Sequence, residues 1–292
     1  MTATVNVNGD ITGEHQAAVS VFDHGFLYGE GVYEVLRTYG GRPFLLDRHL
    51  RRLRNSAGMI ALSVPLSDDE LAGRIAETIT RAASTTPESS SEWYIRILLT
   101  RGVGELTYDP ALCPVPSIVI IVKPLAEPPA ELYARGVRVI VSSIMRNHPE
   151  SVNPMIKSNN LLNNALAMQE GFRRGAYEVI MRNYKGELAE CAQSNFFIVA
   201  GGVALTPPLS VGLLPGITRE FMWEVGKAAG IHVSEKIVTD LDLYGADEVF
   251  LTGTTREVMP IVEIEDRKIG NGLPGPVTQS LHGTFRKLVT ST

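Results

Sequence analysis

A proline-rich break near the middle of the chain constrains its folding more than any other local feature. An apolar run at 117–122 predicts a strand, and Lys123-Pro-Leu-Ala-Glu-Pro-Pro129 ends it, because proline lacks a backbone N–H donor. The 292 residues, of which 44% are hydrophobic, suffice for one large or two moderate cores. We therefore predict an N-terminal domain over 1–122, a linker over 123–135 and a C-terminal domain over 136–292.

Strand-like and helical patterns alternate irregularly on both sides of this break. Ser67-Asp-Asp-Glu70 is typical of a capping box, and Leu71, Ile75 and Ile79 then recur at helical spacing. Further helices are expected to start near Lys157 and at Ile217, the second ending at Gly230. Segment 84–91 is rich in Ser, Thr and Pro, which favours an exposed loop. The expected strands are 94–99, 117–122, 137–141, 178–181 and 196–199.

Lys157 is the strongest candidate for a catalytic residue. It stands in Pro154-Met-Ile-Lys157-Ser-Asn-Asn, a strand-like run entering a helix, and Glu190 and Asn195 follow later in Glu-Cys-Ala-Gln-Ser-Asn. A lysine attacks a carbonyl carbon only while its amine is neutral, and a nearby carboxylate can tune a bound ring cofactor. The pattern suggests a Schiff-base lysine, although a lysine at a strand end is more often a solvated surface charge.

Three segments offer groups that could hold a phosphate. Leu214-Pro-Gly-Ile-Thr218 opens a helix whose first amides lack internal partners, so it is either an anion cradle or an ordinary junction. Thr252-Gly-Thr-Thr255 follows an apolar strand and offers hydroxyls and amides, which are also common in loops. The basic stretch 47–54 could direct one arginine inward for a bidentate phosphate contact. Its other arginines, Arg48, Arg51 and Arg54, are expected on a solvated face.

Composition narrows the possible partners. A formal net charge of -5, with 27 basic and 32 acidic residues, gives no general attraction to nucleic acid or to an anionic membrane. The two cysteines, Cys113 and Cys191, exclude a disulfide framework and favour a reducing cytoplasm. The chain start has no signal-peptide pattern, and no apolar run approaches the roughly 20 residues of a membrane span. Six dispersed histidines predict no metal site.

These motifs together resemble a known family. Asp23-His-Gly-Phe-Leu-Tyr28-Gly-Glu-Gly-Val-Tyr33-Glu34 is similar to the N-terminal signature of the fold-type IV (class IV) pyridoxal-phosphate aminotransferases. Lys157, Glu190 with Asn195, Gly216-Ile-Thr218 and Gly253-Thr-Thr255 follow in the family's order and spacing, so the resemblance covers about 8–264. It implies a two-domain α+β fold, D-amino acid aminotransferase-like, with a small α/β N-terminal domain, a larger barrel-like C-terminal domain and the cofactor between them.

The resemblance also implies roles for individual residues. Lys157 resembles the lysine that binds pyridoxal 5'-phosphate covalently and moves the substrate proton, and Glu190 the carboxylate that faces the pyridine nitrogen. The phosphate site would contain Arg52, Ile217, Thr218 and Thr254. The expected cycle is ping-pong, with no metal. Family members are usually homodimers or larger assemblies, and loop 101–110 is the candidate cover for a neighbour's active site, its glycines giving it the freedom to fold over.

The substrate set is expected to include Tyr28, Tyr33, Tyr94, Arg96 and Thr255. Trp93-Tyr94-Ile95-Arg96 resembles the branched-chain aminotransferase pattern, in which the tyrosine holds the α-carboxylate and the arginine receives the distal carboxylate of glutamate. The same two residues would also suit a half-buried strand without a ligand.

Two positions depart from the branched-chain pattern. Val35 stands where many of those enzymes have glycine, and Leu161 where they have tyrosine, and both resemble D-amino-acid aminotransferases. The Arg-x-His pair of those enzymes has no match after Arg101. We therefore expect a branched-chain L-amino-acid transaminase of amino-acid biosynthesis that acts on amino acids and 2-oxo acids. The alternatives are a D-amino acid or (R)-amine transaminase, an aminodeoxychorismate lyase, and a non-catalytic binding protein with the same fold.

Overall fold

The computed structural model describes residues 3–86 and 92–290. Contacts divide the chain into two compact units: unit 1 is Met1–Ala126 with Ile156–Asn160, and unit 2 is Glu127–Met155 with Leu161–Thr292. The boundaries 1–122, 123–135 and 136–292 remain a prediction about independent folding. The contacts nevertheless place residues 156–160 with the N-terminal part of the chain, because their backbone bonds to a strand of unit 1.

Unit 1 is one antiparallel sheet with two long helices and one short helix in its described residues, and its strand order is β2-β1-β6-β5-β3-β4. Its elements are β1 (Thr4–Val7), β2 (Asp10–Gly13), α1 (His24–Leu27), β3 (Gly31–Tyr39), β4 (Arg42–Pro43), α2 (Leu46–Met59), α3 (Asp68–Thr85), β5 (Trp93–Thr100), the 3-10 turn η1 (Pro110–Leu112) and β6 (Ser117–Pro124).

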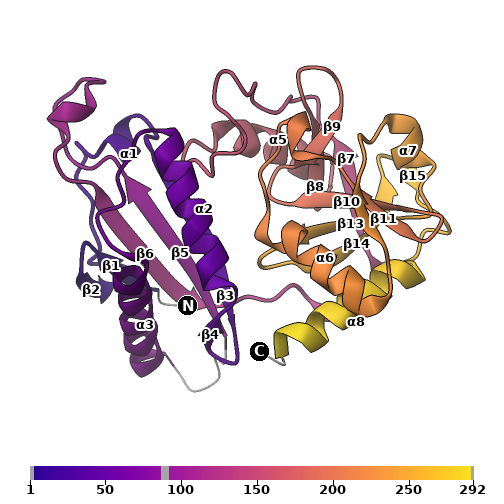
Figure 1. Ribbon diagram of the computed structural model, residues 1–292, viewed down its shortest axis with the longest axis horizontal. Helices are drawn as coiled ribbons and strands as arrows, with labels where there is room; N and C mark the ends of the chain where they lie inside the picture. The colour runs from indigo at the N-terminus through magenta and orange to yellow at the C-terminus, as the bar shows by residue number, and fades with distance from the viewer. Residues whose placement is uncertain (1–2, 87–91, 291–292) are drawn as a thin grey trace. The chain divides into compact units, whose positions relative to one another are not determined.

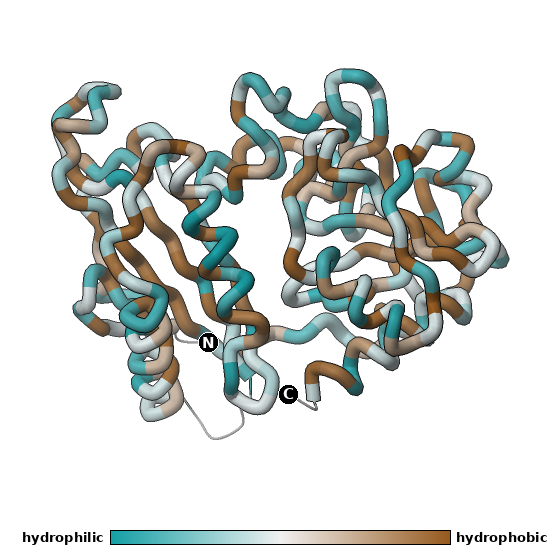
Figure 2. The backbone as a smooth tube through the Cα atoms, in the orientation of Figure 1, coloured by the Kyte–Doolittle hydropathy of each residue, from teal (hydrophilic) through white to brown (hydrophobic). Residues whose placement is uncertain are grey.

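Alternation along the strands decides which face of this sheet is covered. Along β5, Ile95, Ile97 and Leu99 are buried, whereas the residues between them are only half-buried. The buried side chains form one core with those of α2 and α3, and these helices are seen beside the sheet in Figure 1. In Figure 2 the sheet strands are brown along much of their length, whereas α2 shows teal toward the viewer. The residues of the other face are half-buried, so this open face keeps part of its surface exposed.

Unit 2 is a mixed sheet with path β12-β11-β10-β13-β14-β7-β8-β9, and β15 pairs with β14. The pairs β11/β12, β14/β7 and β7/β8 are parallel. Its elements are α4 (Ala130–Arg135), β7 (Val137–Val141), α5 (Leu162–Arg173), β8 (Glu178–Arg182), β9 (Leu188–Cys191), β10 (Asn195–Ala200), β11 (Val203–Thr206), η2 (Leu209–Val211), α6 (Ile217–Ala229), β12 (Val233–Glu235), α7 (Asp240–Tyr244), β13 (Glu248–Gly253), β14 (Glu257–Ile264), β15 (Arg267–Lys268) and α8 (Pro276–Thr290).

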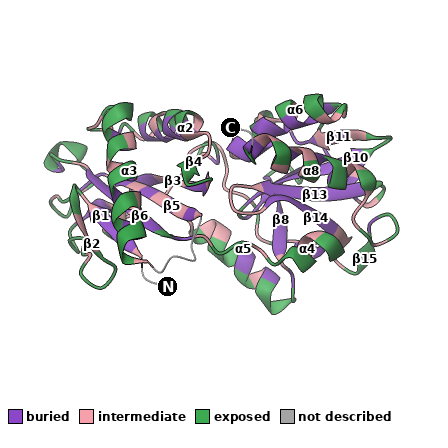
Figure 3. Cartoon of the chain, turned by 90° about the horizontal axis from the view of Figure 1, so that it is seen from below, coloured by how far each residue is buried: buried purple, intermediate pink, exposed green. Residues whose placement is uncertain are grey.

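The sheet of unit 2 curls around its own core (Figure 1), as expected of a barrel-like domain. Its central strands are buried along nearly their whole length, so β13 and β14 are largely purple in Figure 3. Such strands are apolar on both faces, since protein covers both. No helix within residues 3–86 and 92–290 is long and apolar enough to cross a bilayer.

Most predicted elements are confirmed. Ser67 and Glu70 form the capping box that starts α3, and α6 runs from Ile217 to a left-handed Gly230 cap with φ 71°. The five expected strands are present, four of them one or two residues longer than predicted. Within the predicted loop 84–91, α3 continues through Thr85, and residues 87–91 lie outside the described part of the chain.

The prediction around Lys157 is wrong in detail. Lys157 lies in an irregular segment rather than a strand, and α5 begins five positions later, at Leu162. The backbone of this segment pairs with β3 instead. The N–H of Tyr33 donates to the carbonyl oxygen of Lys157 at 2.9 Å, and the N–H of Asn159 donates to that of Gly31 at 2.9 Å. These bonds hold the segment extended, so it cannot wind into a helix.

Candidate active site

Lys157 is anchored by its backbone and half-buried by its side chain. Its N–H donates to the Oγ of Ser56 on α2 at 3.1 Å, and its carbonyl oxygen accepts from β3 as described. The Nζ atom lies 4.5 Å from the centre of the Tyr33 ring. Two backbone bonds thus hold the Cα of Lys157, which leaves the side chain as the part that can move.

The open face of the unit 1 sheet carries three of the five expected substrate residues. Tyr33, Tyr94 and Arg96 share this face, because cross-strand pairing sets Tyr33 opposite Leu98 and Val35 opposite Arg96. The guanidinium carbon of Arg96 lies 4.2 Å from the centre of the Tyr33 ring. Unit 1 therefore brings Lys157, Tyr33 and Arg96 together around one aromatic ring.

Arg52 lies behind that sheet, paired with a carboxylate that the sequence did not single out. Its Nε and Nη2 donate to Oε1 and Oε2 of Glu34, both at 2.7 Å, and the Nδ1 of His49 bonds to Oε2 at 2.7 Å. All three side chains are buried. Because residues alternate along β3, Glu34 faces α2 while Tyr33 faces the open side.

This buried cluster has shifted protonation equilibria. Burial raises the pKa of Glu34, but the charge and hydrogen bonds of Arg52, and then those of His49, outweigh it and lower the pKa to about 2. Burial lowers the pKa of His49, and the charges of Arg52 and Lys157 add to that effect, although Glu34 opposes it. An ionised Glu34 beside a neutral His49 is therefore the favoured state near pH 7, with His49 within electrostatic range of Lys157.

Tyr28 lies at the end of α1 against a different part of unit 1. Its ring centre is 4.9 Å from that of His24 and 5.0 Å from that of Tyr108. Tyr108 belongs to loop 101–110, and the Nε2 of His24 bonds to the carbonyl oxygen of Glu105 at 2.8 Å. Tyr28 is thus placed with the loop rather than with the sheet face that carries Tyr33.

In unit 2, the carboxylate of Glu190 on β9 has donors to both oxygens. Its Oε1 accepts from the Nε of Arg146 at 2.7 Å, and its Oε2 accepts from the N–H of Leu214 at 3.1 Å and the Nδ2 of Asn195 at 3.4 Å. Arg146 also donates through Nη1 to the Oδ1 of Asn163 on α5 at 3.2 Å. A carboxylate held in this way is fixed in orientation.

The start of α6 is built against Asn195. Gly216 is the N-cap of this 13-residue helix and has no side-chain capping bond. A Cβ at Gly216 would lie 2.0 Å from the Oδ1 of Asn195, so no larger residue fits there. The amides of Ile217 and Thr218 open the helix, where partial positive charge favours an anion.

The turn between β13 and β14 carries Thr254 and Thr255. It lies beside the start of β10, since Thr252 is the cross-strand partner of Asn195. The Nη1 of Arg256 bonds to the Oε2 of Glu178 and donates to the Oγ of Ser194 at 2.9 Å. Unit 2 thus gathers the expected carboxylate, the helix amides and the threonine turn around residues 194–195.

The groups of unit 2 fit a phosphorylated pyridine. The N-cap Gly216, which has no side-chain cap and no space for a Cβ, suits a phosphate together with the threonines of α6 and of the β13–β14 turn. The carboxylate of Glu190, which accepts on both oxygens, suits a protonated ring nitrogen. Sequence reasoning missed the supporting residues. A signal existed for His49 and Arg52, which are three apart on one helix face, whereas nothing local indicated Arg146.

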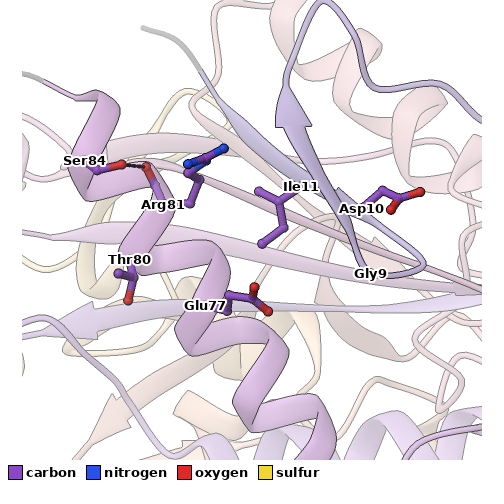
Figure 4. Close-up of a pocket in the computed structure, with 7 residues that line it drawn as sticks. All are labelled: Gly9, Asp10, Ile11, Glu77, Thr80, Arg81 and Ser84. Atoms are coloured by element: carbon purple, nitrogen blue, oxygen red, sulfur yellow. Dashed lines mark hydrogen bonds between the residues drawn. The ribbon is translucent and has the colours of Figure 1, made fainter.

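A separate cavity lies in unit 1, between α3 and the β1–β2 hairpin. It measures about 570 Å³ and is seen in Figure 4, where Glu77 and Arg81 on α3 face the hairpin that contains Ile11. None of the expected site residues lines it. The cavity is lined by Gly9, Asp10, Ile11, Glu77, Thr80, Arg81 and Ser84.

A family model described as amino-transferase class IV matches residues 31–264. The chain is a class IV aminotransferase. The resemblance drawn from the sequence is thereby confirmed, and with it the assignment to an enzyme class whose members use pyridoxal 5'-phosphate.

Relatives named as branched-chain-amino-acid aminotransferases and as D-alanine aminotransferases match the chain over nearly its full length. A Methanocaldococcus jannaschii protein provisionally named a branched-chain-amino-acid aminotransferase is 39% identical over 98% of this chain and 96% of its own. The D-alanine aminotransferase of Bacillus licheniformis is 32% identical over 97% of this chain and 96% of its own.

Solved structures of the T.th. branched-chain amino acid aminotransferase match the fold. The complex with N-(5'-phosphopyridoxyl)-L-glutamate has a TM-score of 0.90 at 31% identity and covers 100% of this chain and 95% of its own. The complex with 4-methylvaleric acid has a TM-score of 0.89 at 31% identity and covers 99% and 94%. These matches confirm the expected fold class.

Proposed function

We propose that this class IV aminotransferase moves an amino group between branched-chain L-amino acids and 2-oxoglutarate in a ping-pong cycle. The observation that carries the proposal is the position of Arg96, a cation on the open sheet face within 4.2 Å of the ring that also contacts Lys157. A carboxylate-bearing partner such as glutamate would use that cation, and an apolar side chain would use the rest of the face. One structure of the related T.th. enzyme contains N-(5'-phosphopyridoxyl)-L-glutamate, and another contains 4-methylvaleric acid, a carboxylic acid with a branched apolar end.

The proposed roles follow from the surroundings of each residue. Lys157 would bind the cofactor covalently and then carry the proton to and from the substrate Cα, since only its side chain is free to move. Ile217, Thr218 and Thr254, with Arg52, would hold the phosphate. Pyridoxal 5'-phosphate, when bound, supplies an electrophilic carbon and a ring that takes up the electrons left on deprotonation.

Glu190 and the polar residues of the substrate set would orient the reacting groups. Glu190, held by Arg146, would keep a proton on the ring nitrogen. Tyr94 and Thr255 would hold the substrate α-carboxylate, with Tyr28 completing the set from the side of loop 101–110. Arg96 would receive the distal carboxylate.

We also propose that the enzyme is a homodimer or a larger homo-oligomer, with loop 101–110 contributing to the neighbouring subunit's site. Apolar side chains are exposed on this loop and on the segment that it contacts, including Phe22, Leu106 and Tyr108. The N–H of Gly104 donates to the carbonyl oxygen of Phe22 at 3.3 Å, so the two segments form one surface. A second copy of the chain is the proposed partner. The free, buried thiols of Cys113 and Cys191 support a cytoplasmic location.

A D-amino-acid transaminase is the second candidate. It is favoured by Val35 and Leu161, and by the similarity to a D-alanine aminotransferase. Single half-reactions with L-leucine, L-glutamate, D-alanine and an (R)-amine, each followed by the loss of cofactor absorbance, would rank the substrates. We expect L-leucine and L-glutamate to react fastest. Faster reaction with D-alanine would replace the proposal by the second candidate.

The role of Lys157 is tested by Lys157→Ala, which removes both the covalent anchor and the proton carrier. We expect no transamination by a folded protein, and no borohydride-stable label on this chain. Substantial turnover by the variant without added amine would contradict the assignment.

A further inference from the structure

The side chain of Arg96 is not directed freely into the open sheet face but lies on the ring of Tyr33. Its guanidinium carbon is 4.2 Å from the ring centre, within the range of a cation–π contact. The inference below concerns the side-chain specificity of the same site, so it depends on the proposed function.

The strand register explains why Arg96 takes this position. Val35 is directly opposite Arg96, and Tyr33 is the next residue on the same face of β3, so Arg96 and Tyr33 are diagonal neighbours. Diagonal side chains are about 7–8 Å apart at their origins, which a long arginine spans easily. The branched side chain of Val35 fills the space directly opposite. Arg96 can therefore lie along the sheet toward Tyr33 more readily than straight across.

The charges around Arg96 also favour this position. The acidic residue between Tyr33 and Val35 is Glu34, which faces α2 and pairs there with Arg52. Lys123, a second cation on the open face, lies 5.2 Å from the centre of the Tyr94 ring. Cations on this face are thus accommodated by aromatic rings, which have a negative face but no formal charge.

A site that accepts both leucine and glutamate must solve one physical problem. A guanidinium that binds a distal carboxylate would be left without a partner beside an isobutyl group, and an unpaired polar group is costly where substrate excludes water. The ring of Tyr33 provides a partial substitute for the carboxylate. Because a bidentate carboxylate contact is stronger than a cation–π contact, glutamate would still attract Arg96 from the ring.

We propose that Tyr33 is a specificity-determining residue that holds Arg96 aside when an apolar side chain is bound and releases it to a distal carboxylate. Val35 is a positioning residue in this arrangement, because it closes the space directly opposite Arg96. The predicted consequence is selective. Without the ring of Tyr33, Arg96 is left unpaired beside an apolar substrate and the binding of that substrate weakens, whereas a dicarboxylate keeps its contact with Arg96.

The test uses two matched probes without an amino group, 4-methylvaleric acid and glutaric acid, with the cofactor-loaded enzyme. Both have the same first carboxylate, and only the far end differs. Equilibrium dissociation constants from titration calorimetry report binding without turnover. We expect Tyr33→Leu to weaken the binding of 4-methylvaleric acid about 3- to 30-fold, which is the range of a cation–π contact. The dissociation constant of glutaric acid should change less than about threefold. Tyr33→Phe retains the ring and should keep the ratio of the two constants near that of the parent enzyme.

A double-variant cycle separates this effect from direct contact between Tyr33 and the probe. If Tyr33 acts through Arg96, then the effect of Tyr33→Leu on the binding of 4-methylvaleric acid should be at least about threefold smaller in an Arg96→Met background than in the parent enzyme. Equal effects in both backgrounds would overturn the inference, as would equal weakening of both probes by Tyr33→Leu alone.

Two further variants distinguish failure of the inference from failure of the proposed function. Arg96→Met should weaken the binding of glutaric acid about ten- to a hundredfold. Lys123→Met, which removes another cation from the same face, should change that binding far less. If Arg96→Met leaves glutaric acid unaffected, the dual-substrate function fails and the inference with it. If Arg96→Met behaves as expected but the cycle shows no coupling, only the role of Tyr33 fails.

Discussion

Two buried carboxylate–arginine pairs, one in each unit, have opposite electrostatic outcomes. Glu34 in unit 1 and Glu178 in unit 2 are both fully buried and both bonded to an arginine. The pKa of Glu34 is lowered to about 2, whereas burial raises the pKa of Glu178 despite the charge of Arg256. The difference follows from the donors. Glu34 receives two nitrogens of Arg52 and one of His49, each at 2.7 Å.

Glu178 has the same number of donors, but only one of them is an arginine nitrogen. Its Oε2 meets one nitrogen of Arg256 and the Oγ of Ser194 at 3.3 Å, and its Oε1 accepts from the N–H of Val179 at 3.0 Å. A nearby positive charge alone therefore does not cancel the rise in carboxylate pKa that burial causes. A bidentate arginine with a second donor cancels it, and a contact with one arginine nitrogen does not. A third buried carboxylate, Glu190, accepts from one arginine nitrogen and two amide donors.

The largest effect is expected for Glu34→Gln. It removes the negative charge to which the buried Arg52 bonds, and breaking one side of a buried ion pair commonly costs about 3 to 5 kcal/mol of unfolding free energy. Urea unfolding at pH 7 would measure the loss, with Glu178→Gln as the matched control. Similar losses for the two variants would break the comparison, because both carboxylates would then be equally stabilising.

The pH dependence of stability should follow the same contrast. The pKa of Glu34 falls from 4.5 to about 2 on folding, so its contribution is complete above pH 4.5 and is lost as pH falls toward 2. That shift corresponds to about 3 kcal/mol. The lowered pKa of His49 acts in the same direction, with loss beginning as pH falls below 6.5. Urea midpoints between pH 7 and 3 should decline for the parent protein and decline less for Glu34→Gln. Parallel curves would assign the acid sensitivity to other groups.

Glu190 allows the comparison to be extended to the proposed chemistry. The neutral amide of Glu190→Gln cannot favour a protonated ring nitrogen, so the rate of proton removal from L-leucine should fall by about tenfold or more. The affinity for the cofactor should fall less. Arg146→Met should act in the same direction with a smaller effect, because two amide donors remain, and Arg146→Lys should recover part of the loss. Single-turnover absorbance measures the rate and fluorescence titration the affinity. An unchanged rate in Glu190→Gln would remove Glu190 from this role.

The smallest effect is expected for Glu178→Gln. A raised pKa means that the folded protein holds the ionised carboxylate less well than water does, so its contribution is present below pH 4.5 and lost as pH rises through the folded-state pKa. The ionised carboxylate also raises the pKa of Arg256, so replacing it removes an attraction as well as a burial cost, and the unfolding free energy at pH 7 should change less than in Glu34→Gln. A loss of several kcal/mol would show that Glu178 and Arg256 form a strong ion pair after all.

Short-range features of both units were predictable from the sequence. The capping box at Ser67 and the left-handed stop at Gly230 depend on neighbouring residues, and both were predicted correctly. Alternation along β5 likewise places Tyr94 and Arg96 on one face, whereas Tyr33 joins them only through the pairing of β3 with β5. The motif order was enough to recognise the family. It did not show that Arg52 shares Glu34 with His49.

Only the tertiary structure decided how distant segments support the candidate site. Lys157 was expected on a strand entering a helix, yet its backbone is held by β3 and by Ser56, which is 101 positions earlier in the chain. Arg146 is 44 positions from Glu190. Propensity and periodicity report only on neighbours within a turn or a strand. The pairing of distant polar groups instead depends on which buried donors and acceptors must be satisfied once the chain has closed around its core. The sequence thus determined the family and the chemistry-bearing residues, and the packing determined which partners orient them.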